Sequence, residues 1–270
     1  MALIRTGYKL NYEELSPEPA MGSAAVIAWD SAIFGFPVAS FRPGPQDFSY
    51  DQIDTFRCRF AAWMQSRNIS VCSSSLAPRQ SFWRQVLPQV GFEFVDLSLQ
   101  VTLSLASVKL PPVRSQLRPA LPEDHAAIEA IAAESFSHGR YHADPRFPRH
   151  LADRRYSQWV RNTLCNPSEI DRMYVLEKGC SVAGFYHVTI EGEVSDLRLA
   201  ALAPDMTGTM LGVELYAAML HELRRQKIRR VVTSISAVNC NVVNLYAMLG
   251  FRFGRPEFVY HWHASRRGKS

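Results

Sequence analysis

The sequence contains no pair of cysteines spaced as Cys-x-x-Cys. Its five cysteines are scattered along the chain, at Cys58, Cys72, Cys165, Cys180 and Cys240. An odd, scattered set argues against a disulfide framework and against a zinc site. We therefore expect reduced thiols and no bound metal.

Long apolar runs are also absent, since no stretch approaches the roughly 18 apolar residues that a membrane-spanning helix needs. Residues 1–14 mix charged and apolar side chains and lack the sustained apolar segment of a secretory signal peptide. These two features predict a cytoplasmic protein that does not act at a membrane.

Positive charge is concentrated in short runs rather than spread evenly. The net charge of +5 comes in part from Arg224-Arg225, Arg229-Arg230 and the tail Arg266-Arg267-Lys269. None of these runs is interleaved with aromatic residues, as a base-stacking platform would be. They suit solvent-facing surfaces or a phosphorylated small ligand, and we expect no nucleic acid partner.

A proline-rich segment suggests where the chain divides. With 270 residues, of which 47% are hydrophobic and 20% charged, the chain is long enough for two modest domains. The segment Leu110-Pro111-Pro112-Val113 suits neither a helix nor a central strand, so it is interpreted as a linker. We predict domains at 1–110 and 114–270.

The two halves share one predicted order of helix, strand, helix and strand. These elements are expected at 56–66, 69–75, 79–89 and 92–105, and again at 211–225, 231–236, 240–248 and from 250 onward. Ile69 precedes Gly91 by 22 positions, as Ile228 precedes Gly250. An internal repeat of this kind indicates two related α/β units with a mixed sheet.

Aligning the two copies separates their functions. Leu87 falls opposite Tyr246, and Gln80 falls opposite Asn239. Only the second copy keeps this polar pair, so chemistry that depends on it belongs to the C-terminal half. The N-terminal half is then a degenerate copy that supports, covers or dimerises.

The C-terminal half contains the strongest binding motif. Helices are expected at 126–133 and 151–164, and strands at 173–177, 182–190 and 194–202. The last strand leads into Pro204 and then Thr207-Gly208-Thr209-Met210-Leu211-Gly212, where a helix begins. Glycines in such a turn let backbone N–H groups face an anion such as a pyrophosphate. A tight turn that needs glycine for its conformation alone explains the same pattern.

Residues 114–263 resemble the GNAT superfamily of acyl-CoA N-acyltransferases. The resemblance is carried by Leu117-Arg118-Pro119-Ala120, by the Pro204-to-Gly212 turn, and by Asn239, Tyr246 and Gly250-Phe251. Thr207 and Met210 depart from it, because the family's phosphate loop has Arg or Gln and glycine at these positions. Over the whole chain, residues 29–39 and 155–162 are similar to nucleotide-amino-sugar acyltransferases of the dTDP-fucosamine acetyltransferase type.

The resemblance implies that a neutral amine attacks the thioester of acetyl-CoA, or of another acyl-CoA, in a gap between two strands. It assigns Tyr246 as general acid at the leaving sulfur and Leu202 as a backbone contact to the pantetheine arm. The loop 207–212 would hold the pyrophosphate, with Asn239 and Asn244 as further cofactor contacts, and no metal takes part.

The amine must be kept neutral by a base. The candidates are Asp196, His187, Glu191 and Glu193. Strand alternation places Asp196 on one face with Arg198, Ala200 and Leu202, so Asp196 is the first candidate, although a structural salt bridge explains it as well. His187 is interpreted either as a substrate contact or as a satisfied histidine on a half-buried strand.

The acceptor is expected at the loop 137–145, where related enzymes close over their substrate. The predicted contacts are His138, Arg140, Tyr141 and His142, with Arg140 holding a phosphate and Tyr141 stacking on a base or sugar. Simple solvation of an exposed loop explains these residues too.

Three other interpretations stay open. The acceptor could be an antibiotic precursor, an amino acid or a peptide amine instead of an amino sugar. The chain could be a non-catalytic module that binds a CoA thioester or a partner protein. A bifunctional acyltransferase and decarboxylase on the same scaffold is a third. A homodimer is compatible with all of them.

Overall fold

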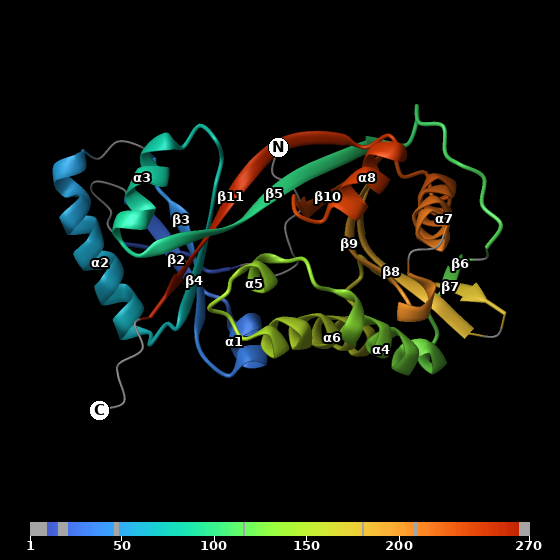
Figure 1. Ribbon diagram of the computed structural model, residues 1–270, viewed down its shortest axis with the longest axis horizontal. Helices are drawn as coiled ribbons and strands as arrows, with labels where there is room; N and C mark the ends of the chain where they lie inside the picture. The colour runs from blue at the N-terminus through green and yellow to red at the C-terminus, as the bar shows by residue number, and fades with distance from the viewer. Residues whose placement is uncertain are drawn as a thin grey trace. The chain divides into compact units, whose positions relative to one another are not determined.

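A computed structural model describes residues 10–15, 21–45, 49–115, 117–179, 181–207 and 210–264 (Figure 1). The chain forms two compact units, each considered separately below. The described part of the N-terminal unit is 10–98, 143–146 and 255–264, apart from the gaps just given. The described part of the C-terminal unit is 99–142 and 147–254, with the same exception.

The N-terminal unit combines α-helices with a mixed sheet. Its strands follow the order β1 (Glu13–Glu14), β2 (Gly22–Val26), β3 (Val38–Pro43), β4 (Val71–Leu76), then β11 (Arg252–His263) and β5 (Phe92–Ser104), the last two being shared with the other unit. Its helices are α1 (Ala28–Phe34), α2 (Ile53–Ser66) and α3 (Ser81–Gln89), with a 3-10 turn η1 (Tyr50–Gln52). Phe41 lies at the centre of an aromatic core, with Phe56, Phe60 and Trp83 around its ring.

The C-terminal unit has one sheet with helices on both faces. Its strand order is β5, β10 (Arg230–Ser236), β9 (Val194–Leu202), β8 (Ser181–Glu191), β7 (Asp171–Lys178) and β6 (Leu117–Pro119). The helices are α4 (His125–Ser135), α5 (Arg140–Ala143), α6 (Arg149–Cys165), α7 (Leu211–Arg225) and α8 (Cys240–Met248), with 3-10 turns η2 (Pro122–Asp124) and η3 (Pro204–Met206). One apolar cluster joins α7 and α8 to one face of the sheet, and another joins α4 and α6 to the other face (Figure 1).

The predicted repeat is present in the structure. The order α2, β4, α3, β5 of one unit matches α7, β10, α8, β11 of the other, and α3 and α8 are both nine residues long. Gln80 and Asn239 occupy the residue before these helices. Gly91 and Gly250 follow them with φ of +92° and +84°, a left-handed conformation in which a side chain would be strained. The prediction of an α/β fold with tandem units is confirmed.

The division into units differs from the predicted one at 1–110 and 114–270. The change of unit falls inside β5, between Ser98 and Leu99. The proline segment is packed, because Leu110 and Val113 contact the apolar core of the C-terminal unit and His221 lies 2.8 Å from the Pro111 carbonyl. Its prolines shape an extended stretch along α7 instead of forming a free linker.

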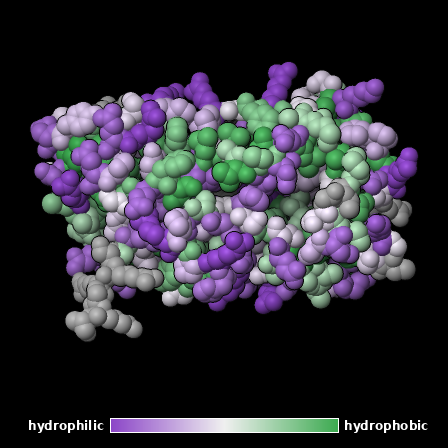
Figure 2. All heavy atoms as spheres, in the orientation of Figure 1, coloured by the Kyte–Doolittle hydropathy of each residue, from purple (hydrophilic) through white to green (hydrophobic). Residues whose placement is uncertain are grey.

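Two features noted in the sequence can be compared with the structure: the lack of long apolar runs and the uneven spread of charge. No helix within the described ranges has the length and apolarity needed to cross a bilayer. Figure 2 shows hydrophilic side chains spread over one face of the molecule, with apolar patches between them instead of one continuous hydrophilic stripe.

Candidate functional site

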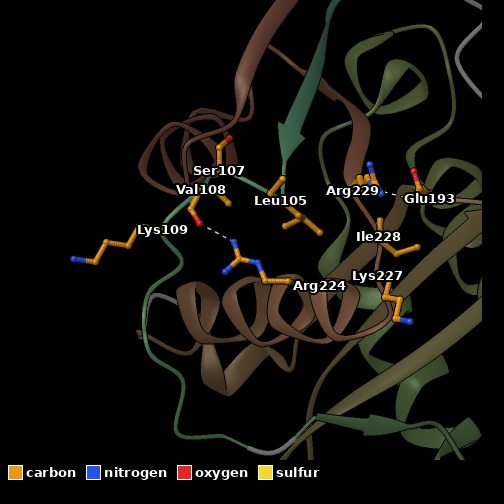
Figure 3. A pocket seen from close by; sticks show the side chains of 10 residues that line it. Leu105, Ser107, Val108, Lys109, Glu193, Arg224, Lys227, Ile228 and Arg229 are labelled. Atoms are coloured by element: carbon orange, nitrogen blue, oxygen red, sulfur yellow. Dashed lines mark hydrogen bonds and ion pairs between the residues drawn. The ribbon is translucent and has the colours of Figure 1, made fainter.

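Two hollows of the C-terminal unit are candidate sites. The larger, about 530 Å³, is lined by the basic side chains of Lys109, Arg224, Lys227 and Arg229 (Figure 3). Two of these cations are already engaged, since Arg229 pairs with Glu193 at 2.9 Å and Arg224 donates to the Val108 carbonyl at 2.6 Å. This hollow lies where β9 and β10 begin, whereas ligands of parallel strands usually bind beyond their carboxyl ends.

The smaller hollow, about 220 Å³, lies toward those carboxyl ends. Strands β9 and β10 are parallel, and their backbone pairing stops at Asp196 and Val232. Beyond that point the Thr233 hydroxyl donates to the Leu197 carbonyl at 2.8 Å, and the strands then separate. Residues 197–200 and 233–236 line the resulting gap. The gap exposes strand backbone to a ligand, an arrangement suited to an extended amide-bearing chain such as pantetheine.

A β-bulge in β9 accompanies the separation. Leu199 pairs with His187 and Leu197 with Val188, so the register skips Arg198. A bulge of this kind bends the strand and increases its twist. As a result, Leu197 joins the apolar cluster on the α7 face, whereas Leu199 joins the cluster on the α4 and α6 face.

The bulge interrupts the side-chain alternation that was predicted along β9. Arg198 lies 5.1 Å from the Trp159 ring, on the α6 face, and pairs with Asp196 at 3.0 Å. Ala200 and Leu202 pack on the opposite face, against the α7 cluster. The expectation that all four residues share one face is therefore wrong, because strict alternation does not continue through a bulge.

Asp196 is buried, and it is not among the described residues that line the gap. Burial raises the pKa of its carboxyl group, although the charge of Arg198 and its hydrogen bond act in the opposite direction. The ion pair with Arg198 gives Asp196 a structural role.

Tyr246 lines the gap from helix α8 and is only 5% exposed. Its ring stacks on Phe251, with centroids 4.6 Å apart, and meets the edge of Tyr216 at 5.5 Å. Burial raises the pKa of the Tyr246 hydroxyl well above its ordinary value, and the adjacent Tyr216 raises it further, whereas the hydrogen bond with Thr233 lowers it. The hydroxyl is therefore protonated at neutral pH and can donate a hydrogen bond into the gap.

Helix α8 begins at the same gap. Asn239 lines it, and its side-chain oxygen accepts a hydrogen bond from the Val242 backbone N–H at 3.3 Å, so the residue caps the helix. Asn244, predicted as a cofactor contact, is exposed one turn further along the helix and does not line the gap.

The predicted phosphate loop lies between β9 and α7. Gly208 and Thr209 fall outside the described residues. Thr207 is exposed and donates to the Pro204 carbonyl, Met210 is 75% exposed, and Leu211 and Gly212 begin α7. The Leu202 carbonyl accepts a hydrogen bond from Ser135 at 3.1 Å, so that oxygen is already engaged on the α4 side.

The predicted acceptor residues are distributed between the gap and the core. Among them His138 lines the gap, beside Ser135, Phe136 and Ser137. Tyr141 is buried against Phe147, and Arg140 lies over the Tyr141 ring, so these two residues pack within α5, which the sequence did not predict.

Two predicted acceptor histidines instead form structural pairs with carboxylates. His142 lies 2.9 Å from Asp153 and stacks on Tyr156. His187 is 1% exposed and lies 2.7 Å from Asp171. Burial lowers the pKa of His187, with Asp171 opposing. Burial would raise the pKa of Asp171, but hydrogen bonds from His187 and Ser168 outweigh it and lower that pKa to about 2.

The sequence did not single out several residues that line the gap: Tyr156, Tyr186, Tyr216, Thr233 and Ser236. Tyr186 and Tyr216 are typical core residues of a strand and a helix, and nothing in their spacing shows that the Tyr216 ring meets both Tyr186 and Tyr246. Tyr156 lies in the segment 155–162 that carries the resemblance, which is the one available signal for it.

The part of the chain that holds the gap, the bulge and the buried tyrosine is matched by a known family. A model described as "Acetyltransferase (GNAT) family" matches residues 125–251, which include β7 to β10 and helices α4 to α8. Residues 125–251 therefore form a GNAT-family acyltransferase domain.

Three known proteins are similar to this chain, one in sequence and two in fold. The spore coat polysaccharide biosynthesis protein SpsD of Bacillus subtilis (strain 168) is 27% identical over 176 residues, which cover 65% of this chain and 60% of SpsD. A GCN5-related N-acetyltransferase from Sphaerobacter thermophilus has a TM-score of 0.65 at 14% identity, covering 90% of this chain and 77% of that one. A tandem GNAT protein from the clavulanic acid biosynthesis pathway has a TM-score of 0.59 at 13% identity, covering 94% and 82%.

Proposed function

We propose that this GNAT enzyme transfers an acetyl or other short acyl group from CoA to the primary amine of a nucleotide-linked amino sugar. The observation that carries the proposal is the gap between β9 and β10, which opens directly beside the buried hydroxyl of Tyr246. An acyl thioester in this gap would have strand backbone along its length and a hydrogen-bond donor beside its sulfur.

The proposed reaction joins the amine nitrogen to the thioester carbonyl carbon. The C–S bond then breaks, CoA leaves as a thiol, and one proton leaves the nitrogen. Backbone N–H groups that face the gap along residues 197–200 are the proposed donors to the oxyanion. Tyr246 donates to the sulfur as negative charge develops there, so its contribution is greatest in the transition state.

The proton from the amine needs an acceptor. Among the described residues that line the gap, the ionisable side chains are His138, Arg198 and the tyrosines Tyr156, Tyr186, Tyr216 and Tyr246. Burial raises the pKa of Tyr186, Tyr216 and Tyr246, so these phenols do not serve as bases near neutral pH. Imidazole both accepts and releases a proton in that range. We assign the acceptor role to His138 in preference to the ion-paired Asp196.

The acceptor end of the gap suits a hydroxylated ligand. Ser137, Ser234 and Ser236 line it together with Arg198. Tyr156 stacks on Phe136 with centroids 4.5 Å apart, which forms an aromatic wall of the kind that packs against sugar rings. The printed name of SpsD, a spore coat polysaccharide biosynthesis protein, is consistent with a sugar-derived acceptor.

A crystal structure with bound CoA tests the placement of the donor. We expect the pantetheine arm between β9 and β10, the sulfur within hydrogen-bond reach of the Tyr246 hydroxyl, and the pyrophosphate at residues 207–212. CoA bound elsewhere, or a gap that stays closed to it, would favour the non-catalytic module instead.

A further inference from the structure

Three side chains of the N-terminal unit converge on one buried carboxylate. Nδ1 of His261 lies 2.8 Å from Oδ2 of Asp144, and Nε2 of His263 lies 2.6 Å from the same oxygen. The side chains of Asp144 and His261 are fully buried, and that of His263 is 16% exposed. The cluster is therefore closed on all sides except beside His263.

Strand β11 presents the two histidines together. Successive side chains of a strand point to opposite faces, so His261 and His263 share one face while Tyr260 and Trp262 occupy the other. Tyr260 and Trp262 pack into the apolar core of the unit. The segment 143–146 brings Asp144 to the histidine face, which produces a His-x-His pair opposed by a carboxylate.

This set of donors has the composition of a metal site. Two imidazoles and one carboxylate ligate Zn²⁺ and other divalent transition ions in many proteins, with further positions left to water. The three ligand atoms lie within 4.8 Å of one another. Zinc bonds of about 2.1 Å place tetrahedral ligand atoms roughly 3.4 Å apart, so the present separations of His261 and His263 from Asp144 would open by roughly 0.6 and 0.8 Å to admit an ion.

The charges around the cluster are compatible with a cation. The second carboxylate oxygen of Asp144 accepts the Arg146 backbone N–H at 2.9 Å and lies 3.6 Å from the Arg146 guanidinium. That guanidinium is itself paired with Glu93 at 2.6 Å. Arg146 thus contacts the Asp144 oxygen that the histidines do not, donates to the His261 backbone carbonyl at 3.3 Å, and is partly neutralised by Glu93.

We propose that Asp144, His261 and His263 bind a divalent transition-metal ion, with Zn²⁺ as the best match, as a structural site of the N-terminal unit. The ion would fasten the segment 143–146 to strand β11. The three ligands belong to the N-terminal unit, whereas the residues that line the acyl-transfer gap all belong to the other. The metal site is therefore separate from the residues of the proposed reaction. It adds a bound ion that the sequence did not predict.

The test uses the full chain without a histidine tag. Metal content is measured by plasma mass spectrometry, and Zn²⁺ affinity by calorimetry after chelation. Co²⁺ serves as a spectroscopic probe, because its visible bands report ligand type and geometry. We expect one tightly bound Zn²⁺ per chain and a higher melting temperature with Zn²⁺ than without it.

Three variants separate a metal site from a purely hydrogen-bonded cluster. His263→Gln keeps a side-chain donor for Asp144 but removes the imidazole, so a hydrogen-bonded cluster would largely survive while metal affinity falls at least about tenfold. Asp144→Asn should have the same effect on Zn²⁺ affinity. His150→Ala, a change at an exposed histidine elsewhere, should leave it unchanged.

The proposal stands if the bound ion and its cobalt bands disappear in His263→Gln while His150→Ala keeps both. It is overturned if the wild-type chain binds no stoichiometric Zn²⁺, or if His263→Gln binds Zn²⁺ as tightly as the wild type. The wild-type metal content alone decides the case if Asp144→Asn does not fold.

Discussion

Replacing Tyr246 with phenylalanine removes the one hydroxyl on which the proposed mechanism most depends. The ring should stay in place, because it is 5% exposed and held between Phe251 and Tyr216. The hydroxyl also forms hydrogen bonds with Tyr216 and Thr233. Losing a buried hydrogen bond costs about 1 kcal/mol, so the melting temperature should fall slightly while the fold is kept.

The kinetic effect should be much larger than the effect on stability. A positioned proton donor is worth about 10²- to 10⁴-fold in rate, which corresponds to roughly 3 to 5 kcal/mol of activation free energy. Because the donor acts on charge that develops at the sulfur, kcat should fall by that factor while KM for acyl-CoA changes little. The assay follows release of free CoA thiol under conditions where chemistry limits turnover.

Two matched variants complete the Tyr246 experiment. Tyr216→Phe removes a neighbouring buried hydroxyl that also lines the gap, and it should lower kcat far less. Leu87→Met changes the equivalent position of the N-terminal unit, where a volume-conserving exchange should cost less than about 1.5 kcal/mol and leave the rate unchanged. Nearly full turnover of Tyr246→Phe would refute the reasoning and assign the proton donor to another residue or to water.

Further predictions concern the cofactor, the base and acid stability. Calorimetry should give one CoA per chain, and Gly208→Val should weaken its binding; two CoA per chain, or unchanged affinity, would contradict this. His138→Gln should lower kcat, while Asp196→Asn should lower it far less. Asp171 has a pKa of about 2 in the folded chain, below its unfolded value near ~3.9. It therefore stabilises the fold by about 2 kcal/mol above roughly pH 4, and this is lost as the pH falls through 2. Urea unfolding of Asp171→Asn should show a shallower loss of stability between about pH 5 and pH 2 than the wild type.

Much of the fold could be predicted because local signals and the repeat agree. The expected helix at 240–248 and strand at 194–202 match α8 and β9. Asn239 as the helix cap and Gly250 in a left-handed conformation follow from residue type and position. Because residue type marks both ends of this helix, the place of Tyr246 along it could be predicted as well.

Other features depend on contacts that one sequence does not reveal. The bulge at Arg198 changes the face of every later residue of β9, and no local residue type announces it. Pro111 and Pro112 look like a linker, but their packing depends on His221, 110 residues away from Pro111. The cluster at Asp144 joins residues 117 and 119 positions apart, so spacing alone gave no reason to expect a metal site.

The central claim is that the chain acylates a small-molecule amine with CoA as donor. Its most direct test incubates the wild-type chain with acetyl-CoA and a panel of amines that includes nucleotide-linked amino sugars, amino acids and peptides. Mass spectrometry of the products should show an amide about 42 mass units heavier than the nucleotide amino sugar, which is the mass that one acetyl group adds. Tyr246→Phe should form this product at least about 100-fold more slowly. Acetylation of none of these amines, with acetyl-CoA left intact, would contradict the account.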